Sequence, residues 1–414
     1  MQTSPTPSAP SDPPPTLHPL PYHSKIVDYL KKEEPDLWKW FSSNKVREEH
    51  CDAVRLDLLK STYRLEEATK PRLYALAREV LEKLDLAIPI TFYQANNASG
   101  LNAAIAYLPV EAHIILVGSI LTALSEPELK AMLGHELAHF ALFDGWNGEI
   151  LIASEILEAL NNDSAAQPCH RETARLFRLY SEILADRGAY AATLDPLVTI
   201  TKLVKLETGL TEVSAESYLR QADEILSKGP VKASQQTHPE TFIRAKAIKL
   251  FAEKGAGADE GIQKLIEGSM ALNELDLLGQ QKVADTTRKL LNHFLAPHWF
   301  RTEPVLAHAR TFFADFTPEA SAALESTTVE SIRASDPSLH EYYSYLLLDF
   351  VAVDRQLEEA PLAAGLLLSE QLGMKEQFAP IALRELALTK KRFTTIERDA
   401  AKILERANSI AKES

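Results

Sequence analysis

The segment LGHELAHFALFD, residues 133–144, carries two histidines four positions apart, with a glutamate directly after the first. On a helix, His135 and His139 lie one turn apart on the same face, so both imidazoles can reach one ion. A catalytic zinc site uses three protein ligands and keeps one position for water. Glu136 could accept a proton from that water and pass it to a leaving amine. The pattern predicts a Zn²⁺ site for hydrolysis; the alternative is an ordinary helix with two solvated histidines.

A third ligand has to come from another part of the chain, and residues 176–206 form a second strong helical pattern with suitable carboxylates. Glu182 and Asp186 lie one turn apart on one face of that helix. Glu182 would complete a His-His-Glu set, and Asp186 could hydrogen-bond a ligand imidazole and fix its tautomer. The alternative for Glu182 is a surface ion pair with Arg178. Spacing alone leaves both interpretations open.

The elements that must position these residues can be read from local patterns. Ser125 can cap the first helix, with Glu128 completing a capping box. An apolar face would bury that helix and consists of Leu129, Met132, Leu133, Leu137 and Phe140. Short β-branched or aromatic segments at 88–94, 101–109 and 112–118 predict a small sheet. From about residue 119 onward the pattern is helical, so we expect a mainly α protein with one small β-sheet.

Composition narrows the class of protein. The 414 residues carry a formal charge of −14, which argues against a nucleic-acid partner or an anionic membrane surface. Apolar runs fall short of the roughly 20 residues needed to cross a bilayer, so no integral membrane segment is expected. Two cysteines cannot build a disulfide framework, and a reducing compartment, the cytoplasm, is the expected location.

Composition also predicts the domain organisation. Residues 1–22 contain eight prolines and no Lys or Arg, and are expected to be a disordered tail. Short helices follow over 23–64, and the next segment, 65–255, carries the HELAH motif. The glycine-rich segment KGAGADEG, residues 254–261, is expected to be a linker to a helical C-terminal domain over 262–414.

The motifs GHELAH and EILAD together resemble the HtpX-like, CAAX-prenyl-protease type of zinc metallopeptidase. The resemblance implies a zincin-like helical metallopeptidase domain over 65–255, in which His135, His139 and Glu182 bind one zinc ion and Glu136 is the general base. It also places Asp144 where the family often has an acid or histidine that closes the active-site helix. Its implied substrates are proteins or peptides.

Two further segments match that family. LNAAIAYLP, residues 101–109, resembles its Asn-Ala strand, which implies that Asn102, Ala103 and Ala104 line the cleft and bind extended substrate backbone. THPETFIRAKAI, residues 237–248, resembles its His-Pro-x-x-x-x-Arg signature. By this resemblance His238 stabilises the developing oxyanion or occupies the open position in a latent state, and Arg244 pairs with an acid. The alternative for His238 is an ordinary histidine at a helix start.

Residues 335–414 resemble a TerB-like helical domain. Such a module could select substrates or cover the cleft, or it could be a scaffold that buries apolar surface. We therefore interpret the sequence as a soluble zinc-dependent metalloendopeptidase. The alternative is a non-proteolytic helical interaction protein with a structural or vestigial zinc site.

Overall fold

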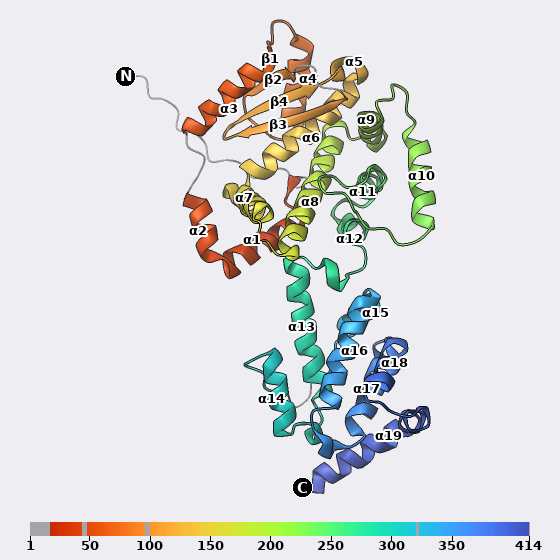
Figure 1. Ribbon diagram of the computed structural model, residues 1–414. Helices are drawn as coiled ribbons and strands as arrows, with labels where there is room; N and C mark the ends of the chain where they lie inside the picture. Colours follow the sequence, from red (N-terminus) through yellow and green to blue (C-terminus); the bar gives the residue numbers. More distant parts are fainter. Residues whose placement is uncertain (1–16, 44–47, 96–99, 320–322, 414) are drawn as a thin grey trace. The chain divides into compact units, whose positions relative to one another are not determined.

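The structure is a computed structural model that describes residues 17–43, 48–95, 100–319 and 323–413. It divides into two compact units, of which unit 1 ends at Gly268 and unit 2 begins at Ser269. Both units are built mainly from helices, and unit 1 also holds a small sheet (Figure 1). This architecture confirms the predicted fold class.

Three helices open unit 1, where the sequence predicts short helices. They are α1 (Pro21–Glu33), α2 (Pro35–Ser43) and α3 (Glu48–Ser61). Most of the predicted tail lies outside the described residues, but its last part does not. Leu17 and Leu20 are buried. Residues 17–22 therefore pack against the rest of unit 1, because their leucines join its core, and they differ in this from the expected disordered tail.

The sheet has four strands in the order β1-β2-β4-β3. Their bounds are β1 (Thr62–Leu65), β2 (Ile90–Ala95), β3 (Asn102–Leu108) and β4 (Glu111–Val117). β2 and β4 are parallel, and the other two pairs are antiparallel. The strands β2, β3 and β4 coincide with the predicted ones, whereas β1 is too short and too polar to be recognised from its sequence. β3 forms one edge of the sheet and packs against α6 (Glu126–Asp144).

The sheet and α6 share one hydrophobic core. It contains Phe92 of β2, Ile114 and Leu116 of β4, and Leu133 and Leu137 of α6. Helix α4 (Pro71–Lys83) adds its apolar face to the same core. Because the core is continuous, the edge strand β3 and helix α6 are held in a fixed relation to each other.

Helix α6 (Glu126–Asp144) carries the HELAH motif and is buried on almost every side, not on one face as the sequence predicts. The predicted capping box is present, with the Ser125 N–H donating to Glu128 Oε2 at 2.7 Å. Glu128 also pairs with Lys205 at 2.9 Å. The start of α6 is thereby fixed both locally and by a neighbouring helix.

The remaining helices of unit 1 are α5 (Ile120–Ala123), α7 (Glu149–Asn162), α8 (Pro168–Thr193), α9 (Pro196–Thr208), α10 (Ala215–Ser227), α11 (Thr241–Lys254) and α12 (Asp259–Glu267), with the short 3₁₀ helices η2 (Trp146–Gly148) and η3 (Gly255–Ala258). Of these helices, α7, α8 and α9 pack directly against α6. The helix predicted over 176–206 is two helices, α8 and α9. The chain turns at Leu194, and Asp195 then caps α9 by accepting from the Leu197 N–H at 2.8 Å.

The segment 254–261, expected to be a linker, forms η3 and the start of α12 instead. Ala258 and Ile262 are buried. Their packing outweighs the low helix propensity of the three glycines nearby. The division between the two units falls after Gly268, beyond this segment.

Unit 2 is helical throughout its described residues. It comprises α13 (Leu277–Phe294), α14 (Glu303–Phe312), α15 (Ser326–Arg333), α16 (Pro337–Val351), α17 (Ala360–Gln371), α18 (Lys375–Glu385) and α19 (Lys390–Glu413), with η4 (Leu272–Glu274), η5 (His298–Phe300) and η6 (Arg355–Leu357). Its core includes Leu290, Phe300, Leu347, Phe350 and Phe378. The resemblance of residues 335–414 to a TerB-like domain stays a prediction.

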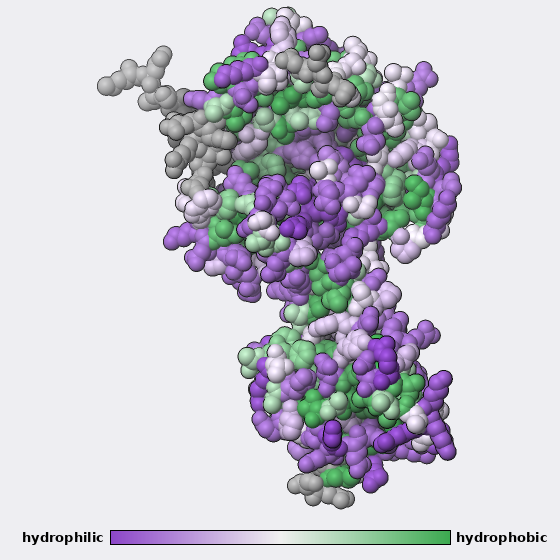
Figure 2. Space-filling view, viewed as in Figure 1, coloured by the Kyte–Doolittle hydropathy of each residue, from purple (hydrophilic) through white to green (hydrophobic). Residues whose placement is uncertain are grey.

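Within the described residues, none of the helices combines the length and the apolar character needed to cross a bilayer. In the view of Figure 2, hydrophobic residues gather near the strands of unit 1, and hydrophilic residues dominate the surface below them.

Candidate metal centre

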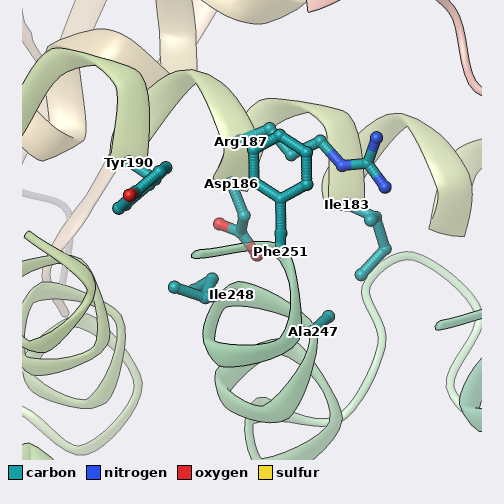
Figure 3. Close-up of a pocket in the computed structure, with 7 residues that line it drawn as sticks. All are labelled: Ile183, Asp186, Arg187, Tyr190, Ala247, Ile248 and Phe251. Carbon is teal, nitrogen blue, oxygen red and sulfur yellow. The ribbon is translucent and has the colours of Figure 1, made fainter. Parts of the chain in front are cut away.

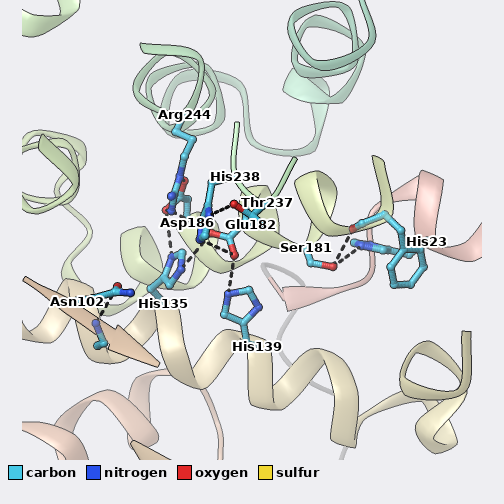
Figure 4. A network of polar contacts seen from close by, with 12 residues as sticks. His23, Asn102, His135, His139, Ser181, Glu182, Asp186, Thr237, His238 and Arg244 are labelled. Atoms are coloured by element: carbon cyan, nitrogen blue, oxygen red, sulfur yellow. Dashed lines mark hydrogen bonds and ion pairs between the residues drawn. The ribbon is translucent and has the colours of Figure 1, made fainter. Parts of the chain in front are cut away.

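The candidate metal centre lies where α6 and α8 pack against each other. His135 and His139 come from α6, and their rings are nearly perpendicular with centroids 5.0 Å apart. Glu182 comes from α8 and points between them (Figure 4). Its carboxylate oxygens lie 3.5 Å from His135 Nε2 and 3.3 Å from His139 Nε2. The structure therefore brings together the two histidines and the distant carboxylate that the sequence predicts as ligands.

The spacing of these three groups fits a metal ion. Within the described parts of the chain, one group of metal-ligating side chains places ligand atoms within 4.8 Å of one another, and it is His135, His139 and Glu182. Tetrahedral zinc with bonds of about 2.1 Å separates its ligand atoms by roughly 3.4 Å, close to the distances found here. Glu182 Oε2 is also buried and makes no hydrogen bond, although Arg244 Nη2 and His135 Nε2 lie at ion-pair distance, 3.3 and 3.5 Å. A cation would satisfy that oxygen, so the donor set fits a zinc ion.

Asp186 and Arg244 hold the ligands from behind. His135 Nδ1 lies 3.1 Å from Asp186 Oδ1, so with Asp186 ionised the Nδ1–H donates and Nε2 is left unprotonated toward Glu182. The Arg244 guanidinium grips Asp186 with two hydrogen bonds of 2.7 and 2.8 Å. It also lies 3.3 Å from Glu182 Oε2. The acid expected to pair with Arg244 is therefore Asp186, on the same helix as Glu182.

Burial and neighbouring charges shift the pKa values of Asp186 and Glu182 in opposite directions. Burial raises the pKa of Asp186, but Arg244 and His135 outweigh it and leave the pKa below its usual value. For Glu182, burial likewise raises the pKa, and the two imidazoles and Arg244 bring it well below the usual range. Both carboxyls are therefore ionised at neutral pH, as a metal ligand and its supporting hydrogen-bond acceptor must be.

His238 is the histidine from outside the two helices that reaches this group. Its Nε2 lies 3.5 Å from Glu182 Oε1, and its Nδ1 lies 2.9 Å from Thr237 Oγ1 (Figure 4). The side chain is 53% exposed, whereas the other members of the cluster are largely buried. Its partial burial lowers its pKa. A mostly neutral imidazole on the open side can donate to or accept from a substrate.

Glu136 and the edge strand complete the predicted set. Glu136 is buried on α6 beside His135. On β3, Asn102 and Ala104 are exposed and Ala103 is buried, and Asn102 Oδ1 accepts from the Ala103 N–H at 2.9 Å. Asp144 ends α6, where its Oδ1 accepts from the Tyr107 hydroxyl of β3 at 3.2 Å. That bond connects the end of α6 to the edge strand.

A crevice behind the metal centre shows how closely α8 and α11 pack. It is lined by Ile183, Asp186, Arg187, Tyr190, Ala247, Ile248 and Phe251 (Figure 3). The Arg187 guanidinium lies over the Phe251 ring at 4.3 Å. The crevice is too narrow to hold a ligand, and its packing keeps Asp186 in place.

Three residues near the centre were not predicted from the sequence. Lys202 of α9 is 1% exposed and lies near Asp186 and Arg244. Burial lowers the pKa of its ammonium group. His23 of α1 lies 3.2 Å from Ser181, the neighbour of Glu182. Arg175 of α8 holds the segment that precedes His238. In the sequence, each looks like an ordinary residue of an amphipathic helix, so no local signal identifies it.

Two histidines of an HExxH helix and a glutamate from a second helix are the ligand arrangement that HExxH metallopeptidases use. Residues 67–252 match the family model of peptidase family M48, so this part of the chain is similar to that family. The matched segment lies within unit 1 and includes α6, α8 and most of α11. Comparisons with curated proteins and with solved structures found no match.

Proposed function

We propose that this protein is a zinc-dependent metalloendopeptidase that cleaves peptide bonds in proteins or peptides. The observation that carries the proposal is the convergence of Glu182 with His135 and His139, at the spacing that one tetrahedral ion requires. Two histidines and a glutamate form the ligand set of several catalytic zinc sites. Zinc bound there would polarise the scissile carbonyl and bring the pKa of water toward neutrality.

The residues around the centre then have separate roles in hydrolysis. Glu136 accepts the proton of the attacking water and delivers it to the leaving nitrogen. His238, on the open side of the centre, donates to the oxygen on which negative charge develops. Asp186 keeps His135 in the required tautomer, and Arg244 keeps Asp186 ionised and oriented.

The substrate is proposed to bind along β3. This strand is at the edge of the sheet and packs against α6. An extended peptide can add to it as a further strand, with Asn102, Ala103 and Ala104 contacting its backbone. The small alanine side chains leave room for the side chains of the substrate. The proposed location remains the cytoplasm, which rests on the two cysteines of the chain and on Cys169 being an unpaired, buried thiol.

Glu136→Gln tests the proposal. The variant should retain about one zinc per chain, as in catalytic sites with three protein ligands. It should lose at least ~100-fold in peptide cleavage, the range expected for a general base. Metal analysis and cleavage of a protein substrate provide the two readouts. Cleavage unchanged in Glu136→Gln removes the base assignment. A wild-type protein that binds zinc, fails to bind a hydroxamate and cleaves nothing supports the alternative, a closed structural site.

A further inference from the structure

Residues 229–240 join α10 to α11 without regular secondary structure and carry His238 near their end. We call this segment the strap. Its placement decides where the His238 imidazole lies, because His238 Nε2 is 3.5 Å from Glu182 while most of its side chain faces solvent. The inference below rests on the proposed role of His238 in peptide hydrolysis.

Arg175 of α8 anchors the middle of the strap. Its Nη1 donates to the carbonyl oxygens of Ala233 and Gln235, each at 3.1 Å. Its Nε and Nη2 donate to the two carboxylate oxygens of Glu172, each at 2.7 Å. The residue is only 4% exposed. A guanidinium fixed on one side by a carboxylate therefore presents its other edge to two strap carbonyls.

Other contacts hold the strap on either side of this anchor. The Ala233 N–H donates to the Ile266 carbonyl at 3.1 Å, and Ala233 is fully buried. Ser234 donates from its N–H and its hydroxyl to Glu240 Oε1, at 3.0 and 2.6 Å. These contacts close the strap on itself and onto α12. Arg175 hydrogen-bonds the strap to α8, the helix that also carries Glu182, and Lys232 of the strap adds an ion pair with Glu172 of α8 at 3.7 Å.

We propose that Arg175 is a positioning residue for catalysis, which sets the strap so that His238 faces the metal centre. Arg175 precedes Glu182 by two turns on one rigid helix. The position of the strap is therefore fixed relative to Glu182. A displacement of about 1 Å in a catalytic group can cost ~100-fold in rate. Lysine cannot replace this residue, because one ammonium does not present the planar fork that bridges a carboxylate and two carbonyls.

The experiment compares Arg175→Gln and Arg175→Lys with the control Arg178→Gln. Arg178 lies on the same helix, and its Nη1 pairs at 2.8 Å with Glu158, whose side chain is 54% exposed. Both Arg175 variants should keep the bound zinc and lower kcat about tenfold or more, following the dependence on alignment. KM should change little, because the edge strand is untouched. Deuterium uptake over 229–240 should rise in both variants and stay unchanged in the control.

A double-variant comparison separates positioning from general destabilisation. If Arg175 acts through His238, Arg175→Lys should change kcat less than about twofold once His238→Ala is present. An equal loss in both backgrounds, or unchanged uptake in the strap, overturns the proposal. Should the wild-type protein cleave nothing, the proposed function fails by itself. In that case the rate at which diethyl pyrocarbonate modifies His238 still tests whether Arg175 positions the strap. Modification at the wild-type rate in both Arg175 variants would disprove this positioning role.

Discussion

Gly134 of α6 and Gly188 of α8 face each other where the two ligand-bearing helices cross, and neither position has room for a methyl group. A Cβ at Gly188 would lie 2.4 Å from the Ala138 Cβ and 2.6 Å from the Gly134 carbonyl oxygen. A Cβ at Gly134 would meet the Ala192 Cβ and the Gly188 carbonyl oxygen, both at 2.6 Å. This close approach brings the Glu182 carboxylate within reach of the two imidazoles.

Gly188→Ala should therefore separate the two helices. Overpacking of a rigid core typically costs about 1–3 kcal/mol. Here it would also increase the distances between Glu182 and the two histidines. We expect lower thermal stability of unit 1 and a weaker affinity for zinc, measured by calorimetry and by competition with a chromogenic chelator. Gly261→Ala is the matched control. Gly261 lies on α12, away from the site, and a Cβ added there would have Leu250 as its nearest neighbour at 3.7 Å. That variant should therefore keep the wild-type affinity for zinc.

Asp186→Asn should weaken zinc binding without removing a ligand. Loss of the carboxylate that orients a ligand histidine typically costs about 10–100-fold in metal affinity. The variant also leaves the buried Arg244 with a single acidic partner, and breaking a buried pair costs roughly 3–5 kcal/mol. Asp223→Asn serves as the control, because it breaks a more exposed pair with Lys246 on α11 and should cost about 0–1 kcal/mol. Equal zinc affinity in the two variants would contradict the proposed support of His135.

The parts of the site that depend on short-range spacing could be predicted from the sequence. The i, i+4 placement of His135 and His139, and of Glu182 and Asp186, follows from helical geometry alone. The resemblance to a known peptidase family then selected Glu182 as the third ligand, a choice that spacing left open. The strands β2, β3 and β4 were predictable because their apolar and β-branched residues stand out from a helical background.

The parts that depend on distant contacts could not be predicted. Arg175 meets the strap across about 60 residues of chain, and a lone arginine on a helix gives no hint of such a partner. The burial of Ala258 and Ile262 converted a glycine-rich segment into helix. In the same way, the packing of Leu17 and Leu20 ordered the end of a proline-rich stretch. In each case tertiary packing overrode a compositional signal.

Removal of the metal should destabilise unit 1 alone. A ligand that binds the folded state at 100 times its Kd adds about 2.7 kcal/mol of stability. This corresponds to a shift of several degrees in a domain of this size, at roughly 2–4 °C per kcal/mol. We expect a chelator to lower the Tm of the unit 1 transition in the wild-type protein and to have little effect on His139→Ala. His170→Ala, a histidine outside the ligand group, should retain the full response. An identical Tm with and without the chelator in the wild type would argue against a metal site.

His23 should make the stability of unit 1 depend on pH. Its imidazole is fully buried on α1, where Nδ1 accepts from the Leu20 N–H and Nε2 donates to Ser181 Oγ, both at 3.2 Å. Burial lowers the pKa of His23 to about 3, against about 6.5 in the unfolded chain. Between these values the unfolded chain binds a proton that the folded protein does not. The free energy of unfolding should therefore fall as the pH falls below 6.5, by up to about 1.4 kcal/mol per pH unit.

His23→Gln should remove that dependence, because glutamine keeps an amide donor for Ser181 and does not titrate. We expect the variant to be less stable than the wild type at pH 7.5, since the bond from Leu20 is lost, yet to lose less stability between pH 6.5 and 5. Urea unfolding of unit 1 at several pH values measures the slope. His293→Gln, in unit 2, is the control and should leave the unit 1 slope unchanged. Parallel slopes for wild type and His23→Gln would mean that the imidazole is protonated in the folded protein, against the neutral form that its two hydrogen bonds require.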